Sequence, residues 1–366
     1  MNKLNILQIN SAKNWGGGET HLKDLIIGLR DRGHKIFLTV RPQIANKFKE
    51  LDINLKVLPL KNSIDFYSVF KLVQIIKKNE IDIIHVHNGK DYWLAFFVKF
   101  FCKDIKIVAT RHIVKPIKNS FIHKIMLSKI DQFIAVSESV KKEMINSNNI
   151  SKTKIEVIYN GINIKEYKNI NIEYLYKEFD LKIDDFVIGI VGTISDNKNQ
   201  NLFIDIVSDI EISNTRFFIV GEDNTIEQKY KKKLLDKLET KKITDKIVLT
   251  GYREDIKELM SLFDILIIPS KTEAFGLVAI EAMASETPVI ANNIDGLEEI
   301  IQDNYNGFLI NNNSVYKFRK VMMCLYNNKE LYNNIVGNGI CNVKNNFSFQ
   351  KMTNEVEKVY INIISG

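Results

Sequence analysis

The chain has 366 residues, of which 45% are hydrophobic and 26% are charged. This composition is typical of folded globular proteins and excludes disordered and fibrous ones, and the length suits two domains of about 150–200 residues each. Three widely spaced cysteines predict reduced thiols rather than a disulfide framework. The first ten residues are too short an apolar stretch for a signal peptide, and no apolar run reaches about 20 residues. We therefore expect a cytoplasmic protein.

Short runs rich in Ile and Val alternate with longer amphipathic stretches along the whole chain. In the first half this pattern predicts strands at 4–9, 35–40, 81–87, 106–110 and 132–137, and helices at 19–32, 65–79, 91–102, 119–129 and 138–146. In the second half it predicts strands at 186–192, 216–221, 246–252, 265–270 and 288–292, and helices at 201–210, 226–239, 255–263, 276–286 and 314–328. Such alternation favours an α/β fold of two facing, doubly wound Rossmann-like domains with a cleft between them. We place these domains at 1–168 and 169–345, followed by a last helix at 346–366.

The charge is uneven along the chain. Residues 1–168 hold far more Lys and Arg than Asp and Glu, whereas residues 169–366 hold more acidic than basic residues. A basic half indicates an anionic partner, which can be nucleic acid, membrane headgroups or a phosphorylated substrate. Nucleic acid is disfavoured, because arginine is scarce and no aromatic platform interleaves with base-reading residues.

Two glutamates stand near one predicted strand end. Glu273 lies in the loop after the strand, and Glu281 lies about one turn inside the helix that begins near Gly276. The first amides of that helix, including those of Leu277 and Val278, have no intrahelical acceptor and suit a phosphate. Carboxylates beside a phosphate suit vicinal hydroxyls, as in a nucleoside-diphosphate sugar, because each accepts from two adjacent O–H groups. The alternative is a solvated helix residue and a loop surface charge, and spacing alone does not separate the two interpretations.

Turns after other predicted strands also carry glycines and polar residues that suit the same ligand. A glycine turn precedes Lys198, a plausible cation for a diphosphate, and Gly251 with Tyr252 offers backbone against which a base could rest. Taken in order, these stretches resemble glycosyltransferase family 4, whose members are retaining enzymes of the GT-B fold. The match includes the paired-glutamate motif "EAFGLVAIE", the N-terminal "NWGGGETHL", and "VSESV", "NGIN", "ILIIPS", "ETPVIANNIDGLEEII" and "NGFLI", and spans essentially the whole chain. In that family the last helix crosses back onto the first domain.

The resemblance implies a role for each matched residue. Glu281 would bind the ribose hydroxyls, and Glu273 those of the donor sugar. Lys198 matches the lysine on the diphosphate, and His112 matches a histidine beside the donor sugar. The catalytic residues implied are His112, Lys198 and Glu273. The donor-binding residues implied are Gly17, Gly18, Thr193, Gly251, Tyr252, Arg253, Phe275, Gly276, Leu277, Val278 and Glu281. We place Glu19 and His87 on the acceptor side, and Glu299 near it or on a loop of the second domain.

One position departs from the family pattern. The family's second diphosphate cation, an arginine five residues before Lys198, is replaced by Thr193, and Arg253 and Arg111 are the neighbouring cations that could substitute. Two other patterns are rejected. "GGGETHL" is no dinucleotide fingerprint, because His21 takes the place of its last glycine. His85 and His87 are not expected to bind a metal, because the sequence shows no acidic or further histidine neighbours.

Two stretches of the basic half combine lysine with large apolar residues. Residues 114–129 suit either an interfacial helix on anionic lipid or a core-facing helix with a solvated side. For residues 96–103, four phenylalanines favour a core role.

We expect a hexose or N-acetylhexosamine to pass from a nucleotide-diphosphate sugar, UDP by preference, to a lipid-linked or membrane-bound glycan in bacterial surface polysaccharide or lipopolysaccharide synthesis. No metal or other cofactor is expected, and the protein would work in the cytoplasm or at the inner face of the membrane. A nucleotide-sugar epimerase or a phosphorylase of the same fold remains an alternative. Another is a catalytically idle sugar- or membrane-binding protein, which Thr193 favours.

Overall fold

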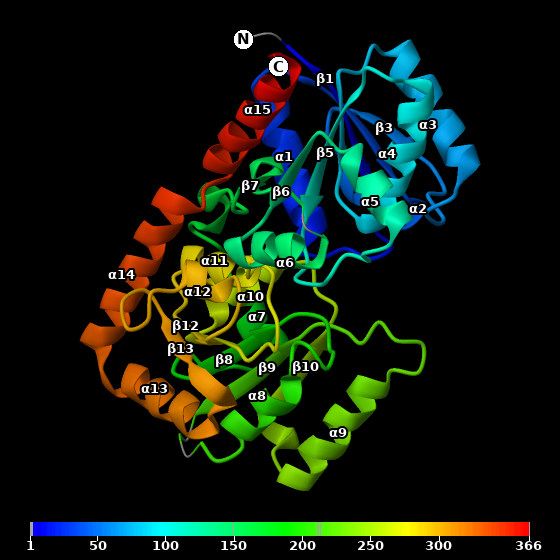
Figure 1. The fold of residues 1–366 in the computed structure, drawn as a ribbon. Coiled ribbons are helices and arrows are strands. Elements are labelled where there is room, and N and C mark those ends of the chain that lie inside the picture. The colour runs from blue at the N-terminus through cyan, green and yellow to red at the C-terminus, as the bar shows by residue number, and fades with distance from the viewer. Residues whose placement is uncertain (1–2, 149, 211, 213, 366) are drawn as a thin grey trace. The chain divides into compact units, whose positions relative to one another are not determined.

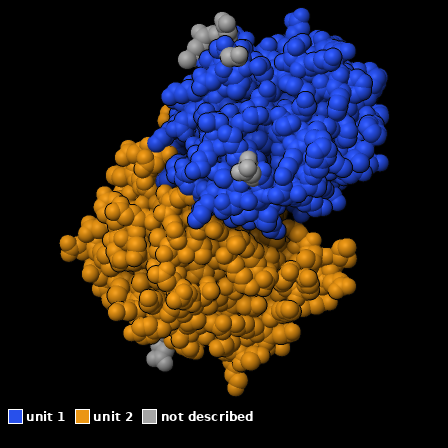
Figure 2. All heavy atoms as spheres, viewed as in Figure 1, with its two compact units in different colours: residues 1–162, 347–366 blue, residues 163–346 orange. Residues whose placement is uncertain are grey.

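A computed structural model describes residues 3–148, 150–210, 212 and 214–365. The chain forms two compact units (Figure 2): unit 1 holds Met1–Ile162 and Phe347–Gly366, and unit 2 holds Asn163–Asn346. The first boundary precedes the expected residue 168, because the short helix η3 (Ile164–Tyr167) packs on helices of unit 2. Within the described residues, no helix is long and apolar enough to cross a bilayer.

Unit 1 is built on a seven-stranded parallel sheet with the strand order β3-β2-β1-β4-β5-β6-β7 (Figure 1). Its strands are β1 (Asn5–Asn10), β2 (Lys35–Val40), β3 (Asn54–Val57), β4 (Ile83–Val86), β5 (Lys106–Arg111), β6 (Gln132–Ala135) and β7 (Ile155–Val157). Its helices are α1 (Gly17–Asp31), α2 (Pro42–Ala45), α3 (Phe66–Lys78), α4 (Gly89–Phe101), α5 (Phe121–Ser128), α6 (Glu138–Asn148) and α15 (Phe349–Ser365). The strand order reverses between β1 and β4, so that the loops after these strands diverge and leave room for a ligand.

The last helix completes the core of unit 1. Buried residues of α1 and α15 recur at helical spacing and join one hydrophobic cluster with residues of the central strands. The two helices approach closely, since a Cβ on Gly28 of α1 would lie 2.2 Å from the hydroxyl of Thr353 on α15. Arg32 and His34 also contact Glu357 of α15, at 2.7 and 2.9 Å.

Unit 2 repeats this architecture with a six-stranded parallel sheet of order β10-β9-β8-β11-β12-β13. Its strands are β8 (Phe186–Val191), β9 (Thr215–Val220), β10 (Ile247–Gly251), β11 (Ile265–Ile268), β12 (Val289–Asn292) and β13 (Phe308–Ile310). Its helices are α7 (Glu173–Glu178), α8 (Gln200–Val207), α9 (Lys229–Lys241), α10 (Ile256–Leu262), α11 (Leu277–Ala284), α12 (Leu297–Ile300), α13 (Val315–Asn327) and α14 (Lys329–Asn346). Here the order reverses between β8 and β11, which carry Lys198 and Glu273 in the loops that follow them.

Candidate active site

Helix α11 begins where the sequence predicts, with Gly276 as its N-cap. Gly276 has a φ of +103°, in the left-handed region, and a Cβ there would lie 2.6 Å from a methyl carbon of Leu297. The preceding loop is fastened to the loop before α12: the amide of Gly296 donates to the carbonyl of Glu273 at 3.0 Å, and the amide of Glu273 donates to Asp295 at 3.2 Å. The first amides of α11 are thus presented from a fixed backbone.

Lys198 and Glu273 form an ion pair, with 2.6 Å between Nζ and Oε2. The loops that carry them are joined by backbone and side-chain hydrogen bonds: the amide of Lys271 donates to the carbonyl of Asn197 at 2.8 Å, and the Asn197 side-chain amide donates to the carbonyl of Thr272 at 3.0 Å. Both members of the pair are only partly exposed. The fold therefore brings together a cation and a carboxylate that lie far apart in the sequence.

Glycine makes room for the lysine. The stem of Lys198 lies on Gly192, where a Cβ would be 3.2 Å from the lysine Cε and where φ is +146°. Gly221, at the end of β9, lies against the carbonyl oxygen of Gly192: a Cβ added to Gly221 would be 2.1 Å from that oxygen. The amide of Gly221 donates to the carbonyl of Gly251 at 2.9 Å. The ends of β8, β9 and β10 thus form a surface of backbone, flanked by the exposed residues Thr193 and Tyr252.

Glu281 lies in the second turn of α11 and is partly buried. Burial raises the pKa of its carboxyl to about 7. Three smaller effects lower this pKa: the charge of Lys257, a hydrogen bond with Tyr167 of η3, and the charge of Lys198. Glu281 is therefore a desolvated acceptor at the same strand edge as the ion pair.

Arg253, one of the cations expected to replace the missing family arginine, is ion-paired in this structure. Its guanidinium is bound to Asp255 at 2.6 Å and to Glu178, and it lies over the ring of Phe179. Contact with a diphosphate would require it to leave these carboxylates, so its part in neutralising the diphosphate stays a prediction. Glu299 lies in α12, where its amide donates to the carbonyl of Gly296.

In unit 1, Gly17 and Gly18 are the first residues of α1 rather than part of a loop, which corrects the expected helix start at residue 19. The extended Gly16 caps this helix, and its carbonyl accepts from the amides of Glu19 and Thr20. Glu19 is buried, and the side chain of Asn10 donates to it at 3.0 Å. Burial raises the pKa of Glu19.

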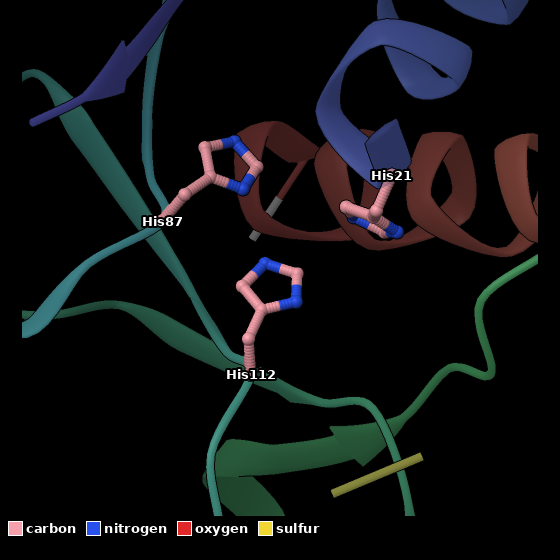
Figure 3. A group of neighbouring side chains, drawn as sticks. All are labelled: His21, His87 and His112. Atoms are coloured by element: carbon pink, nitrogen blue, oxygen red, sulfur yellow. The ribbon is translucent and has the colours of Figure 1, made fainter. Parts of the chain in front are cut away.

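His112 lies against the start of α1, since a Cβ on Gly18 would be 3.7 Å from its ring. His87, which follows β4, and His21 of α1 complete a cluster with it (Figure 3). The expectation that His85 and His87 lack further histidine neighbours is therefore wrong. His85 itself is hydrogen-bonded through both ring nitrogens, to Tyr360 and Thr110, each at 2.6 Å.

Arg111 is 7% exposed, and its side chain donates to the carbonyl of Lys115 at 2.6 Å. It forms no ion pair among the described residues. It lines a pocket of about 260 Å³ in unit 1 together with Trp93, Lys118 and His123. The residues of these sites that sequence reasoning did not single out are Gln8, Asn10, His21, Tyr167 and Asp295. Of these, His21 and Asp295 lay within quoted motifs, but neither was given a functional role.

Two family models match successive parts of the chain. The model described as "Glycosyltransferase Family 4" matches residues 15–166, and the model described as "Glycosyl transferases group 1" matches residues 173–340. Together they cover both units almost completely. The chain belongs to the glycosyltransferases.

Relatives and solved structures agree with this assignment. The glycosyltransferase is 26% identical to "UDP-Gal:alpha-D-GlcNAc-diphosphoundecaprenol alpha-1,3-galactosyltransferase" of Escherichia coli, over 82% of this chain and 80% of the relative. A glycosyltransferase structure from Rickettsia africae matches with a TM-score of 0.90 and 25% identity, and covers 100% of this chain and 99% of that one. The Anabaena protein HepE, solved with UDP and glucose, matches with a TM-score of 0.85 and 22% identity, covering 97% and 99% of the two chains. These likenesses establish the fold as that of GT-B glycosyltransferases.

Proposed function

We propose that this glycosyltransferase transfers a hexose or N-acetylhexosamine, with retention of configuration, from a nucleotide-diphosphate sugar in which UDP is the nucleotide. The observation that carries the proposal is the arrangement at the β8/β11 edge of unit 2. There the loop that carries Lys198 is hydrogen-bonded to the segment that carries Glu273, the start of α11 and Glu281. This set offers a cation and amides for a diphosphate and carboxylates for sugar hydroxyls. The HepE structure with UDP and glucose supports the choice of donor.

The chemistry follows from where charge develops. As the bond between sugar and diphosphate breaks, negative charge grows on the departing phosphate, and Lys198 with the first amides of α11 would stabilise it. Glu273 would accept hydrogen bonds from donor-sugar hydroxyls, and its pairing with Lys198 holds both groups at one place before the donor binds. Glu281 would accept from the ribose diol, which replaces the solvation that its burial removes.

Retention is proposed to proceed without a covalent enzyme intermediate. Glu273, a carboxylate at the proposed diphosphate site, is already paired with Lys198. In this scheme the acceptor hydroxyl attacks from the face that the leaving phosphate vacates, and the phosphate oxygen takes up the proton of that hydroxyl. Lys198 then needs only to remain charged during the step.

A lipid-linked acceptor in surface polysaccharide synthesis is supported by the surface of unit 1. Helices α3, α4 and α5 lie next to one another (Figure 1) and expose large apolar side chains. We call this set the aromatic face; it consists of Phe66, Tyr67, Phe70, Phe100, Phe101, Phe121, Ile122 and Ile125. The core role expected for residues 96–103 is therefore wrong for Phe100 and Phe101. Phe100 lies on the side of α4 away from the buried Ala95 and Val98, whereas Phe101 is exposed as the last residue of the helix.

Basic groups border the aromatic face. Exposed Lys118 and Lys124 flank α5 or lie on it, and the pocket that contains Arg111 opens between α4 and α5. Apolar side chains edged by lysine suit the interface of an anionic membrane. The Escherichia coli relative acts on a diphosphoundecaprenol-linked sugar, as its name states, and an acceptor of this class would be reached from a membrane surface.

The proposal is tested by a thermal-shift screen of the full chain with UDP, GDP, ADP and their sugars. A ligand that binds only the folded state raises the melting temperature, and we expect UDP and one UDP-sugar to do so. The selected donor is then incubated with lipid-linked acceptors, and the anomeric configuration of the product is read by NMR. Inversion of that configuration would overturn the retaining mechanism.

Incubation with the donor alone separates the alternatives. Conversion of the sugar to its epimer would indicate an epimerase, and release of sugar phosphate with inorganic phosphate present would indicate a phosphorylase. Nucleotide binding without hydrolysis or transfer to any acceptor would support an idle binding protein. We expect slow donor hydrolysis that stops in Glu281→Ala.

A further inference from the structure

Three histidines of unit 1 converge at the carboxyl edge of its sheet. His87 directly follows β4, His112 directly follows β5, and His21 lies in the second turn of α1. Their ring centroids are 4.8 Å apart for His21 and His112, 5.8 Å for His87 and His112, and 6.1 Å for His21 and His87. Figure 3 shows the His87 and His112 rings extending toward one another from the strand ends, with the His21 ring beside them.

Their ring nitrogens lack partners although they are buried. Nδ1 of His87, Nε2 of His112 and both nitrogens of His21 have no hydrogen-bond partner in the described part of the chain. One ligand-capable nitrogen from each ring lies within 4.8 Å of the other two. Buried polar atoms are nearly always hydrogen-bonded, so several unpartnered nitrogens this close together form a set of ligand atoms available at one place.

A neighbouring side chain selects which nitrogen of His87 is free. The amide oxygen of Gln8 can only accept, and it lies 2.8 Å from Nε2 of His87. That nitrogen therefore carries the proton, and the lone pair of the ring is on the orphaned Nδ1. The Gln8 side-chain amide in turn donates to Tyr360 at 3.2 Å, which fixes its orientation. Such a hydrogen bond behind the ring is the usual support of a metal-binding histidine.

Beside His21, the side-chain oxygen of Asn160 is a further buried atom without a partner among the described residues, and a small rotation would let it accept from the ring N–H.

We propose that His21, His87 and His112 bind one divalent transition-metal ion of the borderline class, such as Zn²⁺, Co²⁺, Ni²⁺ or Cu²⁺, and leave a further coordination position open. Imidazole suits these ions, whereas Mg²⁺ and Ca²⁺ prefer oxygen ligands. Three histidines and one open position are a known arrangement for zinc. With metal–nitrogen bonds of about 2.0–2.1 Å, tetrahedral ligand atoms lie about 3.4 Å apart, so nitrogens that now lie within 4.8 Å of one another would approach by up to about 1.4 Å.

The resemblance places His112 beside the donor sugar and His87 on the acceptor side, so the test of this inference reads metal binding and does not depend on sugar transfer. Tag-free, chelator-treated full-length protein is titrated with Co²⁺ while its visible absorption is recorded, and Zn²⁺ is then used to displace the cobalt. We expect one ion per chain and the intense absorption of low-coordinate cobalt. Alanine at His21, His87 or His112 should abolish that spectrum, and Gln8→Leu should weaken binding by about 10–100-fold.

The matched control is His123→Ala, which removes a histidine of α5 outside the cluster and should leave the titration unchanged. Each variant is first checked for a cooperative thermal transition, and asparagine replaces alanine in any that does not fold. The proposal is overturned if the spectrum is that of six-coordinate cobalt and persists in all three cluster variants. Binding that is lost in His123→Ala but not in the cluster variants also overturns it.

Discussion

The ammonium of Lys198 lies 2.6 Å from the carboxylate of Glu273, although 75 positions separate them in the sequence. This distance follows from the hydrogen bonds between their two loops and does not depend on a ligand. The pair thus holds the cation in place before a diphosphate arrives.

Lys198→Met keeps the length of the side chain and removes its charge. We expect the transfer rate at saturating donor to fall about a hundredfold, as when one group that stabilises developing negative charge is lost, with a smaller change in donor affinity. Steady-state kinetics with the selected donor measure both. Lys271→Met is the control, because Lys271 is in the same pair of loops but bonds the exposed Asp196. A rate that Lys198→Met leaves near the wild-type value removes Lys198 from the mechanism.

Glu281→Ala tests the ribose contact. We expect it to weaken UDP binding by about 1–3 kcal/mol, the typical cost of leaving buried hydroxyls without an acceptor. Calorimetry of the ligand-free protein with UDP gives the value directly. Glu298→Ala, at an exposed carboxylate of α12, should bind UDP as the wild type does. Equal affinities for all three proteins would exclude the ribose role of Glu281.

Gly276→Ala tests the cap of α11. The left-handed φ and the short distance to Leu297 predict a loss of about 1–2 kcal/mol in the free energy of unfolding, together with weaker UDP binding because the first amides of α11 move. The same change at Gly337 of α14, where an added Cβ would have no neighbour within 4 Å, should be neutral or slightly stabilising. Urea titrations of both variants measure the difference. If both substitutions change the free energy of unfolding equally, the left-handed conformation assigned to Gly276 is wrong.

The histidine cluster makes unit 1 sensitive to acid. The pKa of His21 is about 4 in the folded protein, against 6.5 for the free side chain, so the unfolded chain binds an extra proton between these values. Folding stability therefore decreases as pH falls from about 6.5 to about 4, by as much as about 3 kcal/mol for this residue. His85, His87 and His112 act in the same direction. Burial raises the pKa of Asp91 to about 7, which acts in the opposite direction.

The test compares how much the free energy of unfolding changes between two pH values in the wild type and in two variants. Trp15 and Trp93, the two tryptophans of the chain, both lie in unit 1, so their fluorescence during urea unfolding reports on that unit. Between pH 7.5 and pH 5, His21→Gln should lose less stability than the wild type, and His123→Gln should lose as much. If the difference between wild type and His21→Gln is the same at both pH values, the buried neutral state of His21 is wrong.

The aromatic face predicts binding to anionic vesicles. Flotation with vesicles that contain phosphatidylglycerol should recover the protein, and recovery should fall as salt rises, because the lysine contribution is screened. Replacing Phe121 and Ile122 by serine should reduce recovery severalfold. Ile226→Ser, at a fully exposed apolar residue of unit 2, is the control. Binding that salt or the double substitution does not change argues against a membrane role for this surface.

The sequence predicts the repeated strands and helices because their Ile and Val runs are long and buried. It misses the short edge strands β3, β7 and β13, which have only three or four residues each, and α14, which is rich in Asn and carries two glycines. Weak hydrophobic periodicity leaves little signal for such elements.

At the site, a family pattern was enough to single out Lys198 and Glu273. It could not show that Arg253 is already neutralised, because Glu178 lies in another segment of the chain. The histidine cluster was missed for the same reason: His21 lies in α1, His87 follows β4 and His112 follows β5, and only the fold makes them neighbours. Distances between loops are set by the topology, which local patterns do not encode.

Because α15 supplies Met352, Val356 and Tyr360 to the core of unit 1, that core stays incomplete until α15 has left the ribosome. Unit 2 is one continuous segment and can fold during synthesis. The unit whose strands are made first is therefore the unit whose core is completed last.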